Sequence, residues 1–239
     1  MTLHCVLAHK DFEFPSSYYF NFETVHAYAE HEIKTNLPLT IYKSEYDSRL
    51  FGELGIWKWL YENENADWYC LHHYRRFFEE YHEHVCLPNP IMLNCSLIQQ
   101  LAICHSPKIC EWLQQVLDPY DFNYLNQSNK FYPYNIMQLP KELLAEWLKF
   151  VEPIISKLTE IIGITDYDKM IEFVKNDASF TSNVLPNGQI IEAKNCEPTY
   201  QCRIYAFILE RLTTLFFAKL QGVQIWHCDI HLLEPAQKI

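Results

Sequence analysis

Residues 72–76 read His-His-Tyr-Arg-Arg, so two histidines and two arginines, which can all bind a negatively charged group, lie close together in the chain. An arginine guanidinium can bind a phosphate through two parallel hydrogen bonds, and histidine adds further donors. The segment could therefore neutralise the charge of a diphosphate. A structural interpretation also stays open, in which Arg75 and Arg76 pair with the acids Glu79 and Glu80 while the histidines only pack.

This segment follows a short aromatic and apolar run at residues 68–71, which is typical of a buried β-strand. Another apolar run, at residues 3–8, also ends in polar residues, at His9, Lys10 and Asp11. Open α/β sheets bind their ligands at the carboxyl ends of the parallel strands. We therefore expect both polar segments at the ligand-binding edge of one sheet.

Between these two strands, residues 49–62 carry apolar side chains at spacings of three and four, which predicts an amphipathic helix. A strand, a helix and a strand in this order imply a parallel βαβ unit, and hence an α/β fold with a mainly parallel sheet. Further expected elements are helices at about 96–104, 107–117, 140–162 and 199–220, a bend or interruption at Pro153, a hairpin closed by Asn187 and Gly188, and an edge strand at 224–228.

Four blocks of the sequence, taken in order, are similar to one known family, and the most specific of them is His73-Tyr74-Arg75-Arg76-Phe77. The others are Ala8-His9-Lys10, Glu53-Leu54-Gly55-Ile56-Trp57-Lys58-Trp59, and a two-part block made of Tyr134-Asn135-Ile136-Met137 and Tyr200-Gln201-x-Arg203-x-x-x-Phe207-x-x-Glu210-Arg211-Leu212. Together they span residues 8–212. They resemble the small GT-A-like glycosyltransferases of capsular polysaccharide and O-antigen gene clusters.

The resemblance implies a GT-A-like, Rossmann-type fold, in which a mainly parallel sheet is flanked by helices and the C-terminal part is helical. It implies one glycosyltransferase domain over residues 1–239, with a nucleotide-sugar-binding half at 1–95 and a mostly helical acceptor-side half at 96–239. The implied reaction moves a hexose, with galactose in pyranose or furanose form as the family-level expectation, from a UDP-sugar. The acceptor would be a glycan or a lipid-linked oligosaccharide of a bacterial surface polysaccharide.

The resemblance also assigns roles to individual residues. A helix over the last block puts Arg203 and Glu210 on one face, seven residues apart, while Arg211 points elsewhere. Glu210 is the candidate general base, with Asp177 and Glu53 as alternative carboxylates, although an internal ion pair would also explain Glu210. The donor- or phosphate-binding candidates are His9, Lys10, His73, Tyr74, Arg75, Arg76 and Arg203, and the acceptor- or sugar-binding candidates are Glu53, Trp57, Tyr134 and Asn135.

Metal use remains open between two solutions. In many GT-A enzymes the strand after the first helix ends in Asp-x-Asp, which holds a divalent metal on the donor, whereas here Leu71 is followed by His-His-Tyr-Arg-Arg. Either the arginines replace the metal as counter-charge, or His72 or His73 helps a carboxylate to hold Mn²⁺ or Mg²⁺. We favour the arginines, because both ions prefer oxygen ligands. Zinc at His82-x-His84-x-Cys86 or Cys228-x-x-His231 is disfavoured, because neither motif has a matching second pair.

The sequence departs from the family pattern in two places, since the region from about 36 to 50 looks shorter and Ile136-Met137 replaces Met-Phe. Donor or acceptor choice could therefore differ, or activity could be lost. The main alternative function is a non-catalytic relative that binds a glycan or a partner enzyme. A third alternative is a metal-dependent hydrolase built on the histidine-rich residues 72–86.

The composition excludes several other classes. A formal net charge of −11 argues against broad nucleic-acid binding, and the chain has neither a Gly-rich phosphate loop nor a G-x-S-x-G elbow. The absence of a signal-like N-terminus and of any apolar stretch of 18 residues predicts a cytoplasmic protein. A lipid-linked acceptor would favour peripheral docking on the inner face of the plasma membrane. Nine scattered cysteines without a CxxC pair predict reduced thiols.

Overall fold

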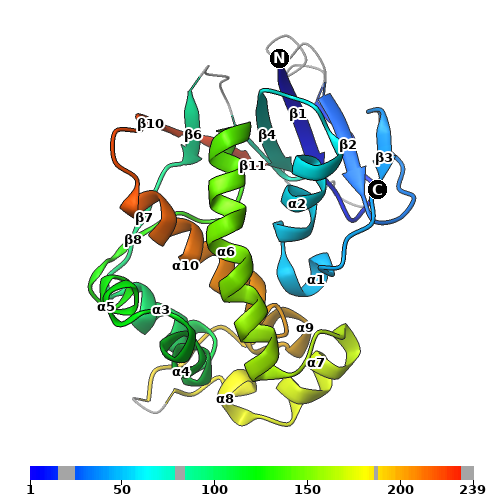
Figure 1. The fold of residues 1–239 in the computed structure, drawn as a ribbon. Coiled ribbons are helices and arrows are strands. Elements are labelled where there is room, and N and C mark those ends of the chain that lie inside the picture. Colours follow the sequence, from blue (N-terminus) through cyan, green and yellow to red (C-terminus); the bar gives the residue numbers. More distant parts are fainter. Residues whose placement is uncertain (16–24, 79–83, 186–187, 233–239) are drawn as a thin grey trace.

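The computed structural model describes residues 1–15, 25–78, 84–185 and 188–232. Its central sheet has the strand order β10-β6-β9-β4-β1-β2-β3 (Figure 1). The first part of the sheet is parallel, because β1 pairs in parallel with both β2 and β4, and β2 pairs in parallel with β3. These strands are β1 (Thr2–Leu7), β2 (Val25–Ala29), β3 (Leu39–Ile41) and β4 (Trp68–His73).

The other part of the sheet closes on itself. β9 pairs antiparallel with both β4 and β6, and β6 pairs in parallel with β10. After His73 the chain turns back as β5, which pairs with the end of β4 and with β11, the strand that directly follows β10. The strands therefore run in a closed circuit around a small interior; the chain itself closes it between β10 and β11, so β10 remains an edge strand of the hydrogen-bonded sheet as described. Their bounds are β5 (Arg76–Phe78), β6 (Val85–Pro88), β9 (Gln138–Pro140), β10 (Ile225–Cys228) and β11 (Ile230–Leu232).

Alternate residues of β4 face two different environments, as the period of two along a strand requires. Tyr69 and Leu71 belong to the main hydrophobic core with helix residues such as Trp57 and Trp147, whereas Cys70 belongs to a separate small cluster. The helices that bring residues to the main core include α1 (Ser48–Phe51), α2 (Leu54–Asn63), α6 (Lys141–Ile162) and α10 (Ile204–Lys219).

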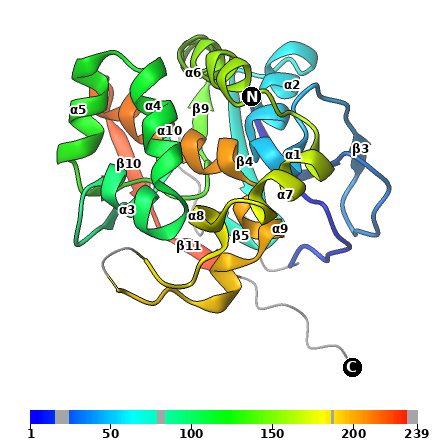
Figure 2. The same cartoon turned by 90° about the horizontal axis from the view of Figure 1, so that it is seen from below.

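The remaining helices gather at the end of the molecule away from β1–β4 (Figure 1). Figure 2 shows α10 between α4 and α5 on one side and α1 on the other, and α10 contacts all three. Ser106 and Asp118 each cap a helix whose first residue is proline, a position where the missing N–H costs nothing. These elements are α3 (Leu97–Cys104), α4 (Pro107–Val116), α5 (Pro119–Gln127), α7 (Tyr167–Lys175), α8 (Ala178–Thr181), α9 (Pro198–Gln201), the 3-10 turn η2 (Ala193–Cys196), and the ribbon of β7 (Ile91–Met92) and β8 (Lys130–Phe131).

The structure confirms the predicted α/β class, the two parallel strands and the edge position of β10 within the described residues. It also confirms helices in the regions predicted at 96–104 and 107–117. Strands from both predicted halves join the central sheet, so the division near residue 95 remains a functional prediction. None of the helices in the described ranges combines the length and apolarity needed to span a bilayer.

Two expectations about helix continuity are wrong, and of the two outcomes expected at Pro153, a bend or an interruption, one is excluded. The helix expected at 49–62 breaks at Gly52, whose φ of 60° lies in the left-handed region that glycine tolerates. The last helix breaks between Gln201 and Ile204. Conversely, α6 continues through Pro153, so the expected interruption is absent.

The expected hairpin at 184–191 is reduced to one antiparallel bridge, between Val184 and Ile190. Asn187, the first of its two expected turn residues, lies outside the described ranges, as does Pro186.

Candidate active site

A cavity of about 500 Å³ opens at the carboxyl ends of the parallel strands. His9 follows β1, Glu30 and His31 follow β2, and His73 is the last residue of β4, and all four line the cavity. The opposite wall comes from the loop and helix after β3 and from the C-terminal helices. Its residues are Tyr42, Asp47, Ser48, Arg49, Gly52, Glu53, Tyr167, Thr199 and Arg203.

The two helix breaks supply the two central charges of this wall. Glu53 precedes α2 directly after Gly52, and Arg203 precedes α10 directly after the second break. At Gly52 a Cβ atom would come within 3.0 Å of the Ala206 Cβ, so the small residue lets α1 and α10 approach closely. The breaks therefore place a carboxylate and a guanidinium beside each other at the cavity.

Burial and neighbouring cations control the charge of two histidines of the cavity, His9 and His73. Together, with burial as the larger cause, they lower the pKa of His9 to about 4 and that of His73 to about 2. The cations that act on His73 include Arg76, Arg75 and Arg203. Both imidazoles are therefore neutral near pH 7, and the arginines carry the positive charge of this region.

Glu53 is the buried carboxyl group of the cavity. Burial raises its pKa, Arg203 counteracts this, and the charge of Glu210 raises the pKa again. The Asn135 side chain donates a hydrogen bond of 3.3 Å to Glu53 Oε2. A carboxyl group with a raised pKa that still receives stabilising contacts suits proton transfer near neutral pH.

Tyr134 and Asn135 have φ angles of 78° and 51°, in the left-handed region that non-glycine residues rarely adopt. The Trp57 indole N–H donates to the Asn135 carbonyl at 3.0 Å, and the Thr213 hydroxyl donates to Asn135 Oδ1 at 2.9 Å. Such strain persists only where the surroundings enforce it, and it is concentrated at functional sites. The structure thus brings Trp57, Tyr134 and Asn135 together behind Glu53.

Glu210 is held by two partners. Its Oε1 accepts a hydrogen bond of 2.9 Å from the Tyr134 backbone N–H, and its Oε2 pairs with Arg211 Nη1 at 2.9 Å. Arg211, expected to point away from the site, is outside the cavity lining as described; its buried side chain contacts Glu210, the Phe207 carbonyl and Gln100. Within the described residues, Glu53 lines the cavity and Glu210 stands behind it. The contacts of Glu210 are thus those of the internal ion pair that is the alternative explanation for this residue.

Arg75 and Arg76 flank the cavity and are outside its described lining. The Arg76 guanidinium carbon lies 4.3 Å from the centre of the Tyr134 ring, and that of the exposed Arg75 lies 5.1 Å from the Tyr74 ring. The charges of both arginines act on the cavity by lowering the pKa of His73. The Tyr74 hydroxyl oxygen lies 3.3 Å from His9 Nε2. The alternative pairing with Glu79 and Glu80 falls outside the described residues.

Two other candidates are placed away from the cavity lining as described. Asp177 caps α8 and forms an ion pair with Lys108, and Lys10 is exposed. Sequence patterns missed Arg49 and Tyr167, whose guanidinium carbon and ring centre are 4.1 Å apart at the cavity. Because 118 positions separate them and neither belongs to a motif, only the fold reveals the pair.

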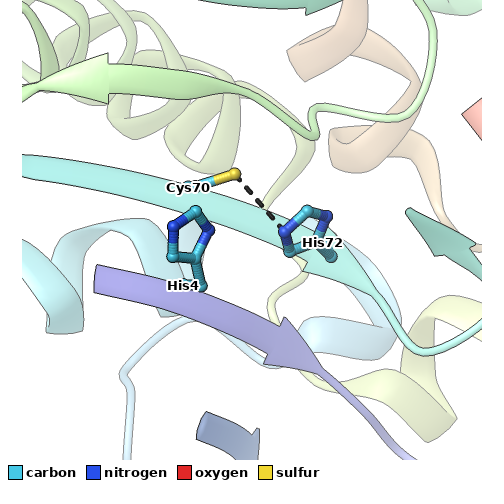
Figure 3. A group of neighbouring side chains, drawn as sticks. All are labelled: His4, Cys70 and His72. Atoms are coloured by element: carbon cyan, nitrogen blue, oxygen red, sulfur yellow. Dashed lines mark hydrogen bonds between the residues drawn. The ribbon is translucent and has the colours of Figure 1, made fainter. Parts of the chain in front are cut away.

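The two adjacent histidines are on opposite faces of β4. His73 lines the cavity with the carboxylates Glu30, Asp47 and Glu53, the oxygen ligands that Mn²⁺ or Mg²⁺ would need. His72 instead lies beside His4 and Cys70 (Figure 3). Of the two histidines proposed to help hold a donor metal, only His73 faces the cavity, and among the described residues its ring nitrogens form no close group of three ligand atoms with these carboxylates.

No family model and no curated protein matches the sequence. Among solved structures, the chain is similar to the apo structure of WbbM, a bifunctional glycosyltransferase, with a TM-score of 0.64 and 12% sequence identity. The likeness covers 99% of this chain and 48% of the WbbM chain, so the chain spans about half the length of the protein it matches. The likeness concerns the fold, and it agrees with the predicted GT-A-like arrangement of a mainly parallel sheet flanked by helices.

Proposed function

We propose that the chain is a glycosyltransferase that binds a nucleotide-sugar donor in the cavity at the carboxyl ends of β1, β2 and β4. The observation that carries this proposal is that buried Glu53 and Arg203 line the same cavity, where the charge of Arg203 acts on the Glu53 carboxyl group, in a chain with a GT-A-like fold. The fold provides the ligand-binding edge, and the two residues provide a base and a counter-charge.

The proposed reaction inverts the anomeric centre. The acceptor hydroxyl oxygen attacks the anomeric carbon, the bond from that carbon to the diphosphate oxygen breaks, and the hydroxyl proton passes to the Glu53 carboxylate. The leaving diphosphate keeps the bonding electrons, and Arg203 stabilises its charge, with Arg75 and Arg76 adding to the local positive potential. Glu53 replaces Glu210 as the preferred base because Glu210 already accepts from Tyr134 N–H and pairs with Arg211.

The finer assignment follows the sequence resemblance. The proposed donor is a UDP-hexose, including galactose in either ring form, and the proposed acceptor is a glycan or lipid-linked oligosaccharide of a surface polysaccharide. A cytoplasmic enzyme on the inner face of the plasma membrane would meet both. Mn²⁺ or Mg²⁺ is a candidate cofactor that would bind with the donor diphosphate and meet carboxylate oxygens of the cavity lining.

A thermal-shift screen with UDP and UDP-sugars, with and without Mn²⁺, tests donor class and metal dependence together. A ligand at 100 times its Kd stabilises a protein by about 2.7 kcal/mol, so the melting temperature of this chain should rise by roughly 5–10 °C. Arg203→Ala should remove the shift, and Lys157→Ala, an exposed change on α6, should preserve it. Failure of every nucleotide to stabilise the protein, together with binding of an oligosaccharide, would support the non-catalytic alternative instead.

A further inference from the structure

The face of β4 that points away from the main core carries a cysteine followed by a histidine, two residue types that bind metals. Cys70 and His72 are two residues apart and therefore share a face, and His4 of β1 is directly in register with Cys70. The potential ligand atoms of these three side chains all lie within 4.8 Å of one another (Figure 3). All three side chains are buried, and all three stand on regular strands.

Two further thiols occupy the same interior. Cys70, Cys86 and Cys228 pack in one cluster inside the closed circuit of strands, together with Phe78 and Ile136. The Cys86 thiol donates a hydrogen bond of 3.4 Å to the His84 carbonyl.

The hydrogen bonds of His72 define its protonation. Its Nδ1 accepts from the Phe78 backbone N–H at 3.3 Å, so the ring proton is on Nε2, which lies 3.4 Å from Cys70 Sγ. Burial lowers the pKa of His72 to about 3 and that of His4 to about 4. Both rings are thus neutral near pH 7, the form in which imidazole binds metals.

We propose that His4, Cys70 and His72 form a binding site for one thiophilic cation, with Zn²⁺ as the ion that this ligand set fits best. Two imidazoles and a thiolate match the preferences of Zn²⁺, whereas Mg²⁺ and Mn²⁺ require oxygen ligands. Cys228 packs in the same cluster as Cys70, but its thiol is not among the mutually close ligand atoms, so these three side chains form the site. Because the site is buried on the face of β4 opposite His73, the cation would brace the closed circuit of strands and take no part in sugar transfer.

Binding requires a defined movement of protons. Zn²⁺ replaces the Cys70 thiol proton, which is released to solvent, and the His72 proton moves from Nε2 to Nδ1. The Phe78 N–H then loses its acceptor, so β5, a strand of three residues, must shift locally. This inference is independent of the proposed glycosyl transfer.

The test uses the full chain purified without a histidine tag, treated with a chelator and then titrated with Zn²⁺ or Co²⁺. The wild type should bind one equivalent of Zn²⁺ in competition with a chromophoric chelator, and Co²⁺ should give a sulfur-to-cobalt charge-transfer band. Cys70→Ala should weaken Zn²⁺ binding by more than about 100-fold, since loss of even an outer-shell contact costs up to that factor. Cys5→Ala is the matched control, because Cys5 is equally buried on β1 but belongs to the main core.

Two results would overturn the proposal. One is a wild type that binds no more Zn²⁺ than the Cys70→Ala variant and shows no charge-transfer band with Co²⁺. The other is a loss of binding in Cys5→Ala equal to that in Cys70→Ala. Should Cys70→Ala fail to fold, the wild-type titration still decides, and His4→Ala on the neighbouring strand serves as the second variant.

Discussion

His73 and His72 are adjacent in the chain but belong to two regions with opposite chemistry. The cavity at His73 gathers arginines and carboxylates from helix breaks and strand ends, where ligands can reach them. The interior at His72 gathers neutral imidazoles and thiols on paired strands, shielded from solvent. Because successive side chains of a strand point to opposite faces, two neighbouring residues can belong to an ionic site and to a site of soft ligands.

The largest expected effect concerns the base of the cavity. Glu53→Gln keeps the size of the side chain but removes the proton acceptor, so kcat should fall by about 10²- to 10⁴-fold, as measured by sugar transfer from the donor that the thermal-shift screen selects. Because burial raises the pKa of Glu53, wild-type kcat should rise with pH through that raised pKa and then level off. The variant should lose this dependence. A larger loss in Glu210→Gln than in Glu53→Gln would return the role to Glu210.

The next effect concerns the counter-charge. Arg203→Ala should lower kcat by roughly 10²- to 10³-fold, the typical cost of removing one group that stabilises a developing negative charge. Zn²⁺ or Co²⁺ binding at Cys70 should be unchanged in the same variant, because Arg203 belongs to the cavity only. Parallel loss of both properties would show that the two regions are coupled.

Acid should destabilise the protein through its buried neutral histidines. His105 belongs to neither region, stacks on Phe207 at 3.7 Å, and has its pKa lowered by burial to about 3. Since the unfolded chain binds the proton near pH 6.5, the contribution of His105 is complete above that pH and is lost as pH falls toward 3.

Between pH 6.5 and 5 this loss is at most about 2 kcal/mol for one such group. Urea unfolding at both pH values measures it, and His105→Gln should reduce the difference by about that amount. An unchanged difference would mean that His105 does not titrate in this way.

The smallest effect concerns the break that positions Glu53. Gly52→Ala meets both an unfavourable φ and the Ala206 Cβ at 3.0 Å, so the free energy of unfolding should fall by more than about 1 kcal/mol. Gly163→Ala, at a φ of 71° with open space around it, isolates the backbone cost of about 1 kcal/mol. Chemical denaturation of both variants gives the difference, and equal values would show that the approach of α1 and α10 is unimportant at Gly52.

Sequence patterns alone predict the α/β class, the parallel pairing of β1 with β4, and the polar segments at the ends of those strands. These features depend on local periodicity, which the residue types along a strand or helix reveal directly. The blocks around Glu53, Tyr134, Asn135 and Arg203 were also visible before the fold was known.

How those blocks contact one another depends on the tertiary structure. The breaks at Gly52 and before Ile204 depend on the packing of α1 against α10, and the contact of Arg49 with Tyr167 joins positions that share no motif. The cluster of His4, Cys70 and His72 needs the register of two strands that are separated by more than sixty residues. Such contacts follow from the global arrangement of elements, which local propensity and spacing do not encode.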